Sequence, residues 1–129
     1  MTLMEPLRPL LAACSRRAKE FLEWCRRPSS SELRGHQLLR EWLSPRQLEQ
    51  FERNDFFEVT GSHTGKKYLI RRGAGMNVCE LDAAGLPQSG WCFVPGVPLV
   101  TGDVMLAQKI ALETDERAAL AVANRFEVR

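Results

Sequence analysis

Residues 59–70, VTGSHTGKKYLI, carry the residue types with which proteins bind phosphate. A glycine-rich loop that follows a β-like run and ends in Gly-Lys can present backbone N–H groups and a lysine to a nucleotide. The phosphate loop needs four residues between its glycines, then a hydroxyl residue after the lysine and a helix. Here three residues separate Gly61 from Gly65, Lys67 replaces the hydroxyl residue, and the β-like run KYLIRRG follows. We therefore interpret this stretch as the connection of a β-hairpin.

His63 is the residue in this loop that could act as a general base. Ser62 and Thr64 flank it, but a catalytic histidine also needs a nucleophile at one ring nitrogen and an orienting acceptor at the other. Turn propensity explains the same residues, so we expect an exposed hairpin tip with no partner within hydrogen-bonding reach of His63. We predict that the chain is not an enzyme; a small enzyme of unknown reaction is the third alternative.

A cluster of basic residues follows the loop and is the candidate anion-binding site: Lys66, Lys67, Arg71 and Arg72. Strand alternation places Lys67 and Arg71 on the polar side, where Glu58 and Glu80 are available as cross-strand partners. This favours a solvated charge ladder. The alternative is a nucleic-acid-binding accessory protein, which would use the cluster together with Arg16, Arg17, Arg26 and Arg27.

The four cysteines, at positions 14, 25, 79 and 92, lack the close ligand spacing of metal sites. Cys79 and Cys92 could become neighbours across adjacent strands, with His36 or His63 completing a site. Small buried thiols are the simpler interpretation. We expect no metal and no cofactor.

Composition indicates an ordinary globular chain. Its 129 residues suit a single domain, and a net charge of +2 does not by itself imply nucleic acid or an anionic membrane. No apolar run approaches the length of about 18 residues needed to span a bilayer, so no membrane partner is expected. Glu5, Pro6, Arg8 and Pro9 interrupt the only segment resembling a signal peptide. We expect a cytoplasmic location with reduced cysteines.

Helix signals dominate the first half. An apolar stripe at spacings of three and four indicates a helix from near Pro9 to Cys25. Ser29 with Glu32 predicts a second helix start, and Ser44 with Pro45 and Gln47 predicts a third. Near the end of the chain, Thr101 or Asp103 should cap a helix that either continues to Asn124 or breaks at residues 114–115 and restarts.

From Phe56 onward the hydrophobic period changes to two. We predict strands near residues 56–60, 67–72, 77–82 and 90–94, joined by short glycine-containing turns. The predicted core side of the first three strands consists of Phe57, Val59, Tyr68, Ile70, Cys79 and Leu81. The sequence thus predicts an α+β domain: N-terminal helices, a four-stranded antiparallel meander and a C-terminal helix packed on one sheet face. Residues 1–43 would form a helical arm and residues 44–129 the core.

The arm holds more large apolar residues than one sheet face needs to cover. The candidate partner-binding residues are Trp24, Leu38, Leu39 and Trp42. Because folding signals occur throughout and catalytic signals do not, we predict a non-enzymatic binding module that contacts a protein partner or another copy of itself.

The runs YLIRRGAGMNVCELDAAG, WCFVP and GDVMLAQKIALE occur in this order between residues 68 and 113. Together they resemble an uncharacterised family of small bacterial proteins, and the resemblance extends from about Leu43 to Phe126. It implies a bacterial source and carries no function with it.

Overall fold

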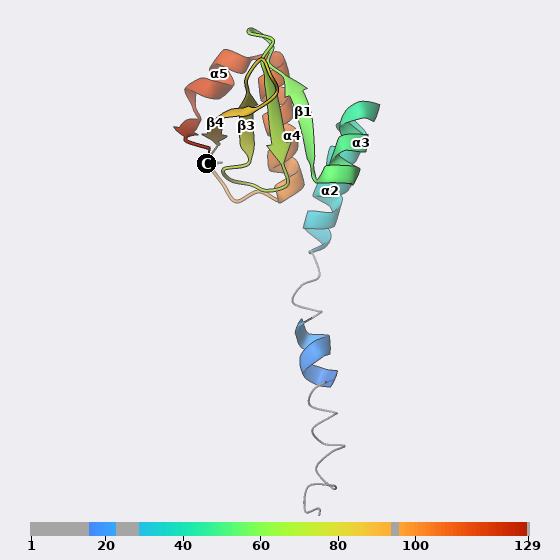
Figure 1. Cartoon of the computed structure of the whole chain (residues 1–129). Coiled ribbons are helices and arrows are strands. Elements are labelled where there is room, and N and C mark those ends of the chain that lie inside the picture. Colours follow the sequence, from blue (N-terminus) through green and yellow to red (C-terminus); the bar gives the residue numbers. More distant parts are fainter. Residues whose placement is uncertain (1–15, 23–28, 94–95, 129) are drawn as a thin grey trace, which may run out of the picture.

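The computed structural model describes residues 16–22, 29–93 and 96–128, which form an α+β fold (Figure 1). Residues 16–22 are helical and lie apart from the sheet in this view. The other elements are α2 (Ser30–Trp42), α3 (Pro45–Asn54), β1 (Phe56–Thr60), β2 (Lys67–Arg71), β3 (Val78–Leu81), β4 (Pro87–Cys92), α4 (Thr101–Thr114), α5 (Glu116–Ala121) and β5 (Asn124–Phe126).

The strands form one antiparallel sheet in the order β1-β2-β3-β4-β5, which confirms the predicted meander. The fifth strand was not predicted. Of the two alternatives for the last helix, the break is observed: α4 ends at Thr114, and the Asp115 side chain caps α5 by accepting a hydrogen bond from the Ala118 N–H. The chain then turns and adds β5 beside β4, where the sequence had predicted helix as far as Asn124.

The predicted inward face is correct for β1 and β2 and wrong for β3. Val78 lies opposite Ile70, and Glu80 lies opposite Tyr68. Directly opposed residues of an antiparallel pair share a face, so Val78 and Glu80 point to the core side and Cys79 points away from it. The reason is that Glu80 finds polar partners on the core side, which the alternation of apolar residues does not reveal.

Helix α4 crosses one face of the sheet (Figure 1) and contributes Met105, Leu106 and Leu112 to the core. Met105 and Leu112 are fully buried there together with Phe57, Tyr68 and Ile70. A reciprocal amide pair also joins the two layers: Asn77 Nδ2 donates to Gln108 Oε1 at 2.7 Å, and Gln108 Nε2 donates to Asn77 Oδ1 at 2.9 Å. Since both side chains are buried, each amide satisfies the other.

Helix α2 packs into this core. Its Gly35 lies against Gly102 of α4 so closely that a Cβ on Gly102 would be 2.3 Å from the Gly35 carbonyl. Leu39 is fully buried in the same interface, so it is not part of an exposed partner-binding surface.

The helix caps are partly as predicted. Ser29 caps α2, and Ser44 with Gln47 forms a complete capping box on α3. The cap of α4 was predicted wrongly, because its N-cap residue is Val100, which has no capping side chain. Glu32 of α2 replaces it: the Thr101 N–H donates to both carboxylate oxygens, at 3.2 and 3.3 Å.

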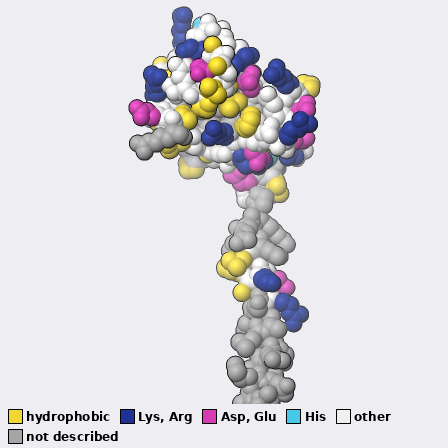
Figure 2. Space-filling model, in the orientation of Figure 1, with side chains coloured by type: hydrophobic (Ala, Val, Ile, Leu, Met, Phe, Trp, Pro, Cys, Tyr) yellow, Lys and Arg dark blue, Asp and Glu magenta, His cyan; other side chains and the backbone are white. Residues whose placement is uncertain are grey.

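The sheet face turned away from α4 is partly apolar. Figure 2 shows hydrophobic side chains gathered in the middle of the domain, with charged side chains around them. On this face Leu69 pairs with Cys79, and the Phe126 ring lies over Gly90, where a Cβ would come within 2.2 Å of the ring. The outer edge of β1 is covered by α3, because the Glu58 N–H donates to Gln50 and its carbonyl accepts from Gln47.

Candidate functional site: a glycine loop closed on Glu116 and an apolar groove along α4

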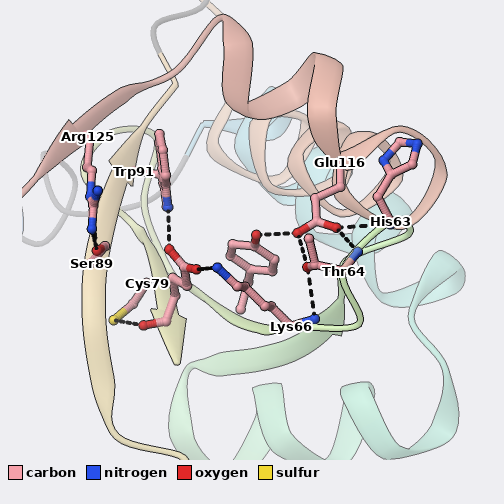
Figure 3. A network of polar contacts seen from close by, with 10 residues as sticks. His63, Thr64, Lys66, Cys79, Ser89, Trp91, Glu116 and Arg125 are labelled. Atoms are coloured by element: carbon pink, nitrogen blue, oxygen red, sulfur yellow. Dashed lines mark hydrogen bonds and ion pairs between the residues drawn. The ribbon is translucent and has the colours of Figure 1, made fainter. Parts of the chain in front are cut away.

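The loop between β1 and β2 does bind an anion, and the anion is a side chain of the same chain. Glu116, the first residue of α5, points into the loop (Figure 3). Its Oε1 accepts the backbone N–H groups of His63 at 3.0 Å and Thr64 at 2.8 Å. Its Oε2 accepts the Thr64 hydroxyl at 2.6 Å and the Tyr68 hydroxyl at 2.5 Å. The carboxylate thus fills the position where a phosphate loop would hold its ligand.

Gly61 makes this arrangement possible. A Cβ at position 61 would lie 2.3 to 2.5 Å from the Glu116 carboxyl atoms, closer than real Cβ contacts come. The glycine therefore serves close approach to a buried carboxylate. The sequence signal of an anion-binding loop was real, but the ligand lies more than fifty residues further along the chain and could not be identified from local spacing.

The environment holds Glu116 in its charged form. The residue is 1% exposed. Burial alone would raise its pKa, but the hydrogen bonds from Thr64, Tyr68 and the loop backbone lower the pKa to about 2. Burial and the negative charge of Glu116 together raise the pKa of the Tyr68 hydroxyl, so this group stays protonated and donates. Neither group is poised to exchange protons near neutral pH.

His63 is exposed, as predicted, but the expectation that it has no partner is wrong. Its Nδ1 accepts the Arg117 N–H at 3.3 Å and lies 3.4 Å from the Ser62 hydroxyl. The same hydroxyl accepts the Glu116 N–H at 3.0 Å. Ser62 and His63 thus bind the first N–H groups of α5, which is a capping role.

The polar network continues across the core side of the sheet next to Tyr68 (Figure 3). Glu80, which is 5% exposed, forms an ion pair with Lys66 at 2.8 Å and accepts the Trp91 indole N–H at 3.2 Å. Beyond it, Arg125 donates to the Ser89 hydroxyl at 2.6 and 3.1 Å, and its guanidinium lies 6.0 Å from the Trp91 ring centroid. These contacts connect β5 to the sheet.

The candidate anion-binding residues do not gather into one patch. Lys66 is paired with Glu80, and Arg72 is paired with Asp55 at 2.9 Å. Lys67 lies 3.8 Å from Glu58 and donates to the Thr60 hydroxyl at 2.6 Å. Arg71 is exposed. Three of the four positive charges are therefore balanced by a carboxylate within the fold.

Arg72 also takes part in a second cluster, between α2, α3 and the end of β2. Its guanidinium lies 4.9 Å from the ring centroid of buried Phe51 and 3.4 Å from His36 Nε2. His36 Nδ1 is buried and, among the described residues, has no hydrogen-bond partner. Burial and then the charge of Arg72 lower the pKa of His36, which favours the neutral ring.

The cysteines that can be placed are separate thiols: Cys79 is buried and Cys92 half-buried. Burial raises the pKa of the Cys79 thiol, so its reactive thiolate form is disfavoured. Among residues 16–22, 29–93 and 96–128, no three His, Cys, Asp or Glu side chains lie together as metal ligands would. In the same part of the chain, no helix has the length and apolar character needed to cross a membrane.

The candidate partner-binding residues have different positions. Leu38 and Trp42 lie one turn apart on α2 and are 41% and 60% exposed. Leu39 is in the core, as described above, and Trp24 lies outside the described residues.

A second apolar surface, which the sequence analysis did not predict, runs along the flank of α4. It is a groove of about 330 Å³ lined by Phe93, Gly96, Leu99, Val104, Ala107, Gln108, Ala111 and Val122. We call it the α4 groove. Leu99 is 46% exposed and Val122 is 78% exposed, and Val97 beside them is 62% exposed. A signal existed in VMLAQKIAL, since apolar residues surround α4 on more sides than one sheet face requires.

Searches with this chain found no matching family model, no matching curated protein and no matching solved structure.

Proposed function

We propose that this chain is a non-enzymatic protein-binding module whose α4 groove accepts an amphipathic helix of a protein. The observation that carries the proposal is the groove itself, a concave surface lined almost entirely by apolar side chains. Large contiguous apolar patches on a protein surface mark interaction sites, and ligand sites are mostly concave and apolar.

The polar groups of the molecule support the same proposal. The loop N–H groups that could bind a substrate anion are taken by Glu116. His63 accepts a backbone N–H of α5, and the nucleophile that the described residues place beside it is Ser62, whose hydroxyl already accepts the Glu116 N–H. The groups that could have bound an anion or taken part in catalysis thus form hydrogen bonds within the fold.

The dimensions of the groove indicate its ligand. Val104, Ala107, Gln108 and Ala111 recur at spacings of three and four along α4, so the floor extends about 10 Å, or two helical turns. An amphipathic helix presents apolar side chains at the same spacing over two turns. Fully burying a side chain such as Leu99 or Val122 contributes roughly 1.5–3 kcal/mol, and part of this gain offsets the cost of association.

The nucleic-acid alternative has less support. Phosphate binding needs unpaired cations, and three of the four candidate cations already face carboxylates.

A direct test uses a model peptide and nuclear magnetic resonance of the full chain. The peptide is a helix of Leu, Ala, Lys and Glu with an apolar stripe over two turns, and its control is a scrambled peptide of the same composition. We expect the patterned peptide to shift the resonances of Ala107, Ala111 and Val122, and Val122→Asp to abolish the effect. Equal shifts from the scrambled peptide, or shifts spread over the whole surface, would rule the proposal out.

A further inference from the structure

We infer that two copies of this chain associate through the outer edge of β5, antiparallel and centred on Phe126, so that their two sheets join into one. Strand β5 is the last in the order of the sheet, and β4 lies on its inner side. In Figure 1 it is the dark red arrow at the margin of the domain. The contact uses residues 124–128, none of which lines the α4 groove, so it is an interaction surface in addition to the proposed one.

The two edges of the sheet differ in what covers them. At β1, helix α3 lies along the edge, where Gln50 accepts the Glu58 N–H and Gln47 donates to the Glu58 carbonyl. At β5, no described segment other than β4 forms a hydrogen bond with the backbone of residues 124–128. The stretch Asn-Arg-Phe-Glu-Val also contains no proline, which would block pairing. An edge of this kind presents unpaired N–H and C=O groups that another strand can bind.

Arg125 and Glu127 supply opposite charges at this edge. Alternation along an extended strand places both on one side of the sheet and Phe126 on the other. The Ser89 hydroxyl accepts two N–H groups of Arg125 and so fixes the guanidinium, which has further N–H groups to donate (Figure 3). Among the described residues, neither Arg125 nor Glu127 forms an ion pair. Both line a hollow of about 600 Å³ beside the edge, so both are accessible to a partner.

The order of these residues indicates both the partner and the register. In a two-fold antiparallel pair of identical strands, one residue lies opposite its own copy at the centre. With Phe126 at the centre, Arg125 of each copy lies opposite Glu127 of the other, so two ion pairs form. Moving the centre to Arg125 or to Glu127 places like charges opposite each other, which is destabilising. The segment is therefore complementary to itself, which favours a second copy over an unrelated strand.

The size of the contact indicates a weak dimer. Specific interfaces typically have about 20–30 residues on each side, whereas this edge offers the five residues from Asn124 to Val128. The two Phe126 rings, adjacent across the two-fold axis, add apolar contact to the backbone hydrogen bonds. We expect a dissociation constant on the order of 100 μM, so the monomer and the dimer are both populated at the concentrations used in nuclear magnetic resonance.

The test follows the backbone amide resonances of the full chain during dilution from about 1 mM to about 10 μM, which brackets a weak dimer. In wild type, the resonances of residues 124–128 should move with concentration. Glu127→Arg places arginine opposite arginine in both pairs and should weaken the dimer roughly tenfold. Glu127 is exposed, so this variant should fold as wild type does. Glu52→Arg is the matched control, because it makes the same charge change at an exposed position on α3, and it should leave the dimer unchanged.

Three outcomes would overturn the inference. If wild type stays monomeric over the whole dilution series, the occupant of this edge is not a second copy. If wild type dimerises but the moving resonances belong to the α4 groove or to Leu38 and Trp42, another surface forms the dimer. If Glu127→Arg dimerises as strongly as wild type, the pairing of Arg125 with Glu127 is wrong. None of these outcomes bears on the α4 groove, which the model peptide tests separately.

Discussion

Replacing Glu116 by glutamine should remove most of the stability that the β1–β2 loop contributes. The pKa of this carboxyl falls from the ordinary value of 4.5 to about 2 in the folded protein. Each pKa unit corresponds to about 1.4 kcal/mol, so the charged form contributes about 3 kcal/mol at neutral pH. Glutamine keeps the shape and can still accept the loop N–H groups but carries no charge. We expect Glu116→Gln to lower the free energy of unfolding by about this amount at pH 7.

The pH dependence provides a sharper test than the value at one pH. Because the folded pKa lies below the unfolded pKa, the stabilisation is complete above pH 4.5 and is lost as the pH falls toward 2. The difference between wild type and Glu116→Gln should therefore shrink over this interval. Urea unfolding followed by circular dichroism at pH 7, 4.5 and 3 measures it.

Glu52→Gln is the matched control, because Glu52 is exposed on α3. This variant should differ little from wild type at every pH. A difference below about 1 kcal/mol for Glu116→Gln at pH 7, the size of a surface effect, would refute the reasoning. So would a difference that stays constant from pH 7 to pH 3.

Gly61→Ala should destabilise the protein nearly as much as Glu116→Gln, since the new methyl group displaces the carboxylate. Denaturant unfolding of the variant that carries both changes should show a loss of unfolding free energy well below the sum of the two single losses. Gly102→Ala should cost about 3 kcal/mol or more, because its Cβ would meet the Gly35 backbone, which cannot rotate away, and a lowered melting temperature would show it. His36 has a lowered pKa, so the unfolded chain binds a proton more readily and stability should fall as the pH drops below about 6.5. His36→Phe should reduce the change of melting temperature between pH 7 and pH 5. An unchanged pH dependence would show that His36 does not cause it.

Local sequence rules predicted the structure correctly where the interacting residues are close together in the sequence. The capping box of Ser44 and Gln47 spans three residues, so it can be read directly and the start of α3 is correct. The same holds for the hairpin between β1 and β2, where a short glycine-containing connection permits only antiparallel pairing. The break between α4 and α5 at Asp115 was one of two alternatives that the sequence predicted. Asp115 favours the break because its side chain can cap a new helix.

Three other features depend on residues far apart in the sequence. Glu80 lies on the core side of β3 because Lys66 of the β1–β2 loop neutralises it and Trp91 of β4 donates a hydrogen bond to it. Strand β5 has only three residues, Asn-Arg-Phe, and forms by pairing with β4 at the edge of the sheet. The cap of α4 is a side chain of α2.

The loop at residues 61–66 depends both on its local sequence and on a residue far away in the sequence. The sequence by itself determined that this segment is a tight glycine-containing hairpin connection, because the backbone freedom of glycine and the alternation of the flanking residues are local properties. Only the tertiary structure decided what its N–H groups bind. Glu116 reaches the loop because α4 and α5 fold back across the sheet, and burial then makes an unpaired carboxylate or an unpaired N–H group too costly to persist. The α4 groove has the same origin, since it exists only where α4, the segment before it and Val122 come together.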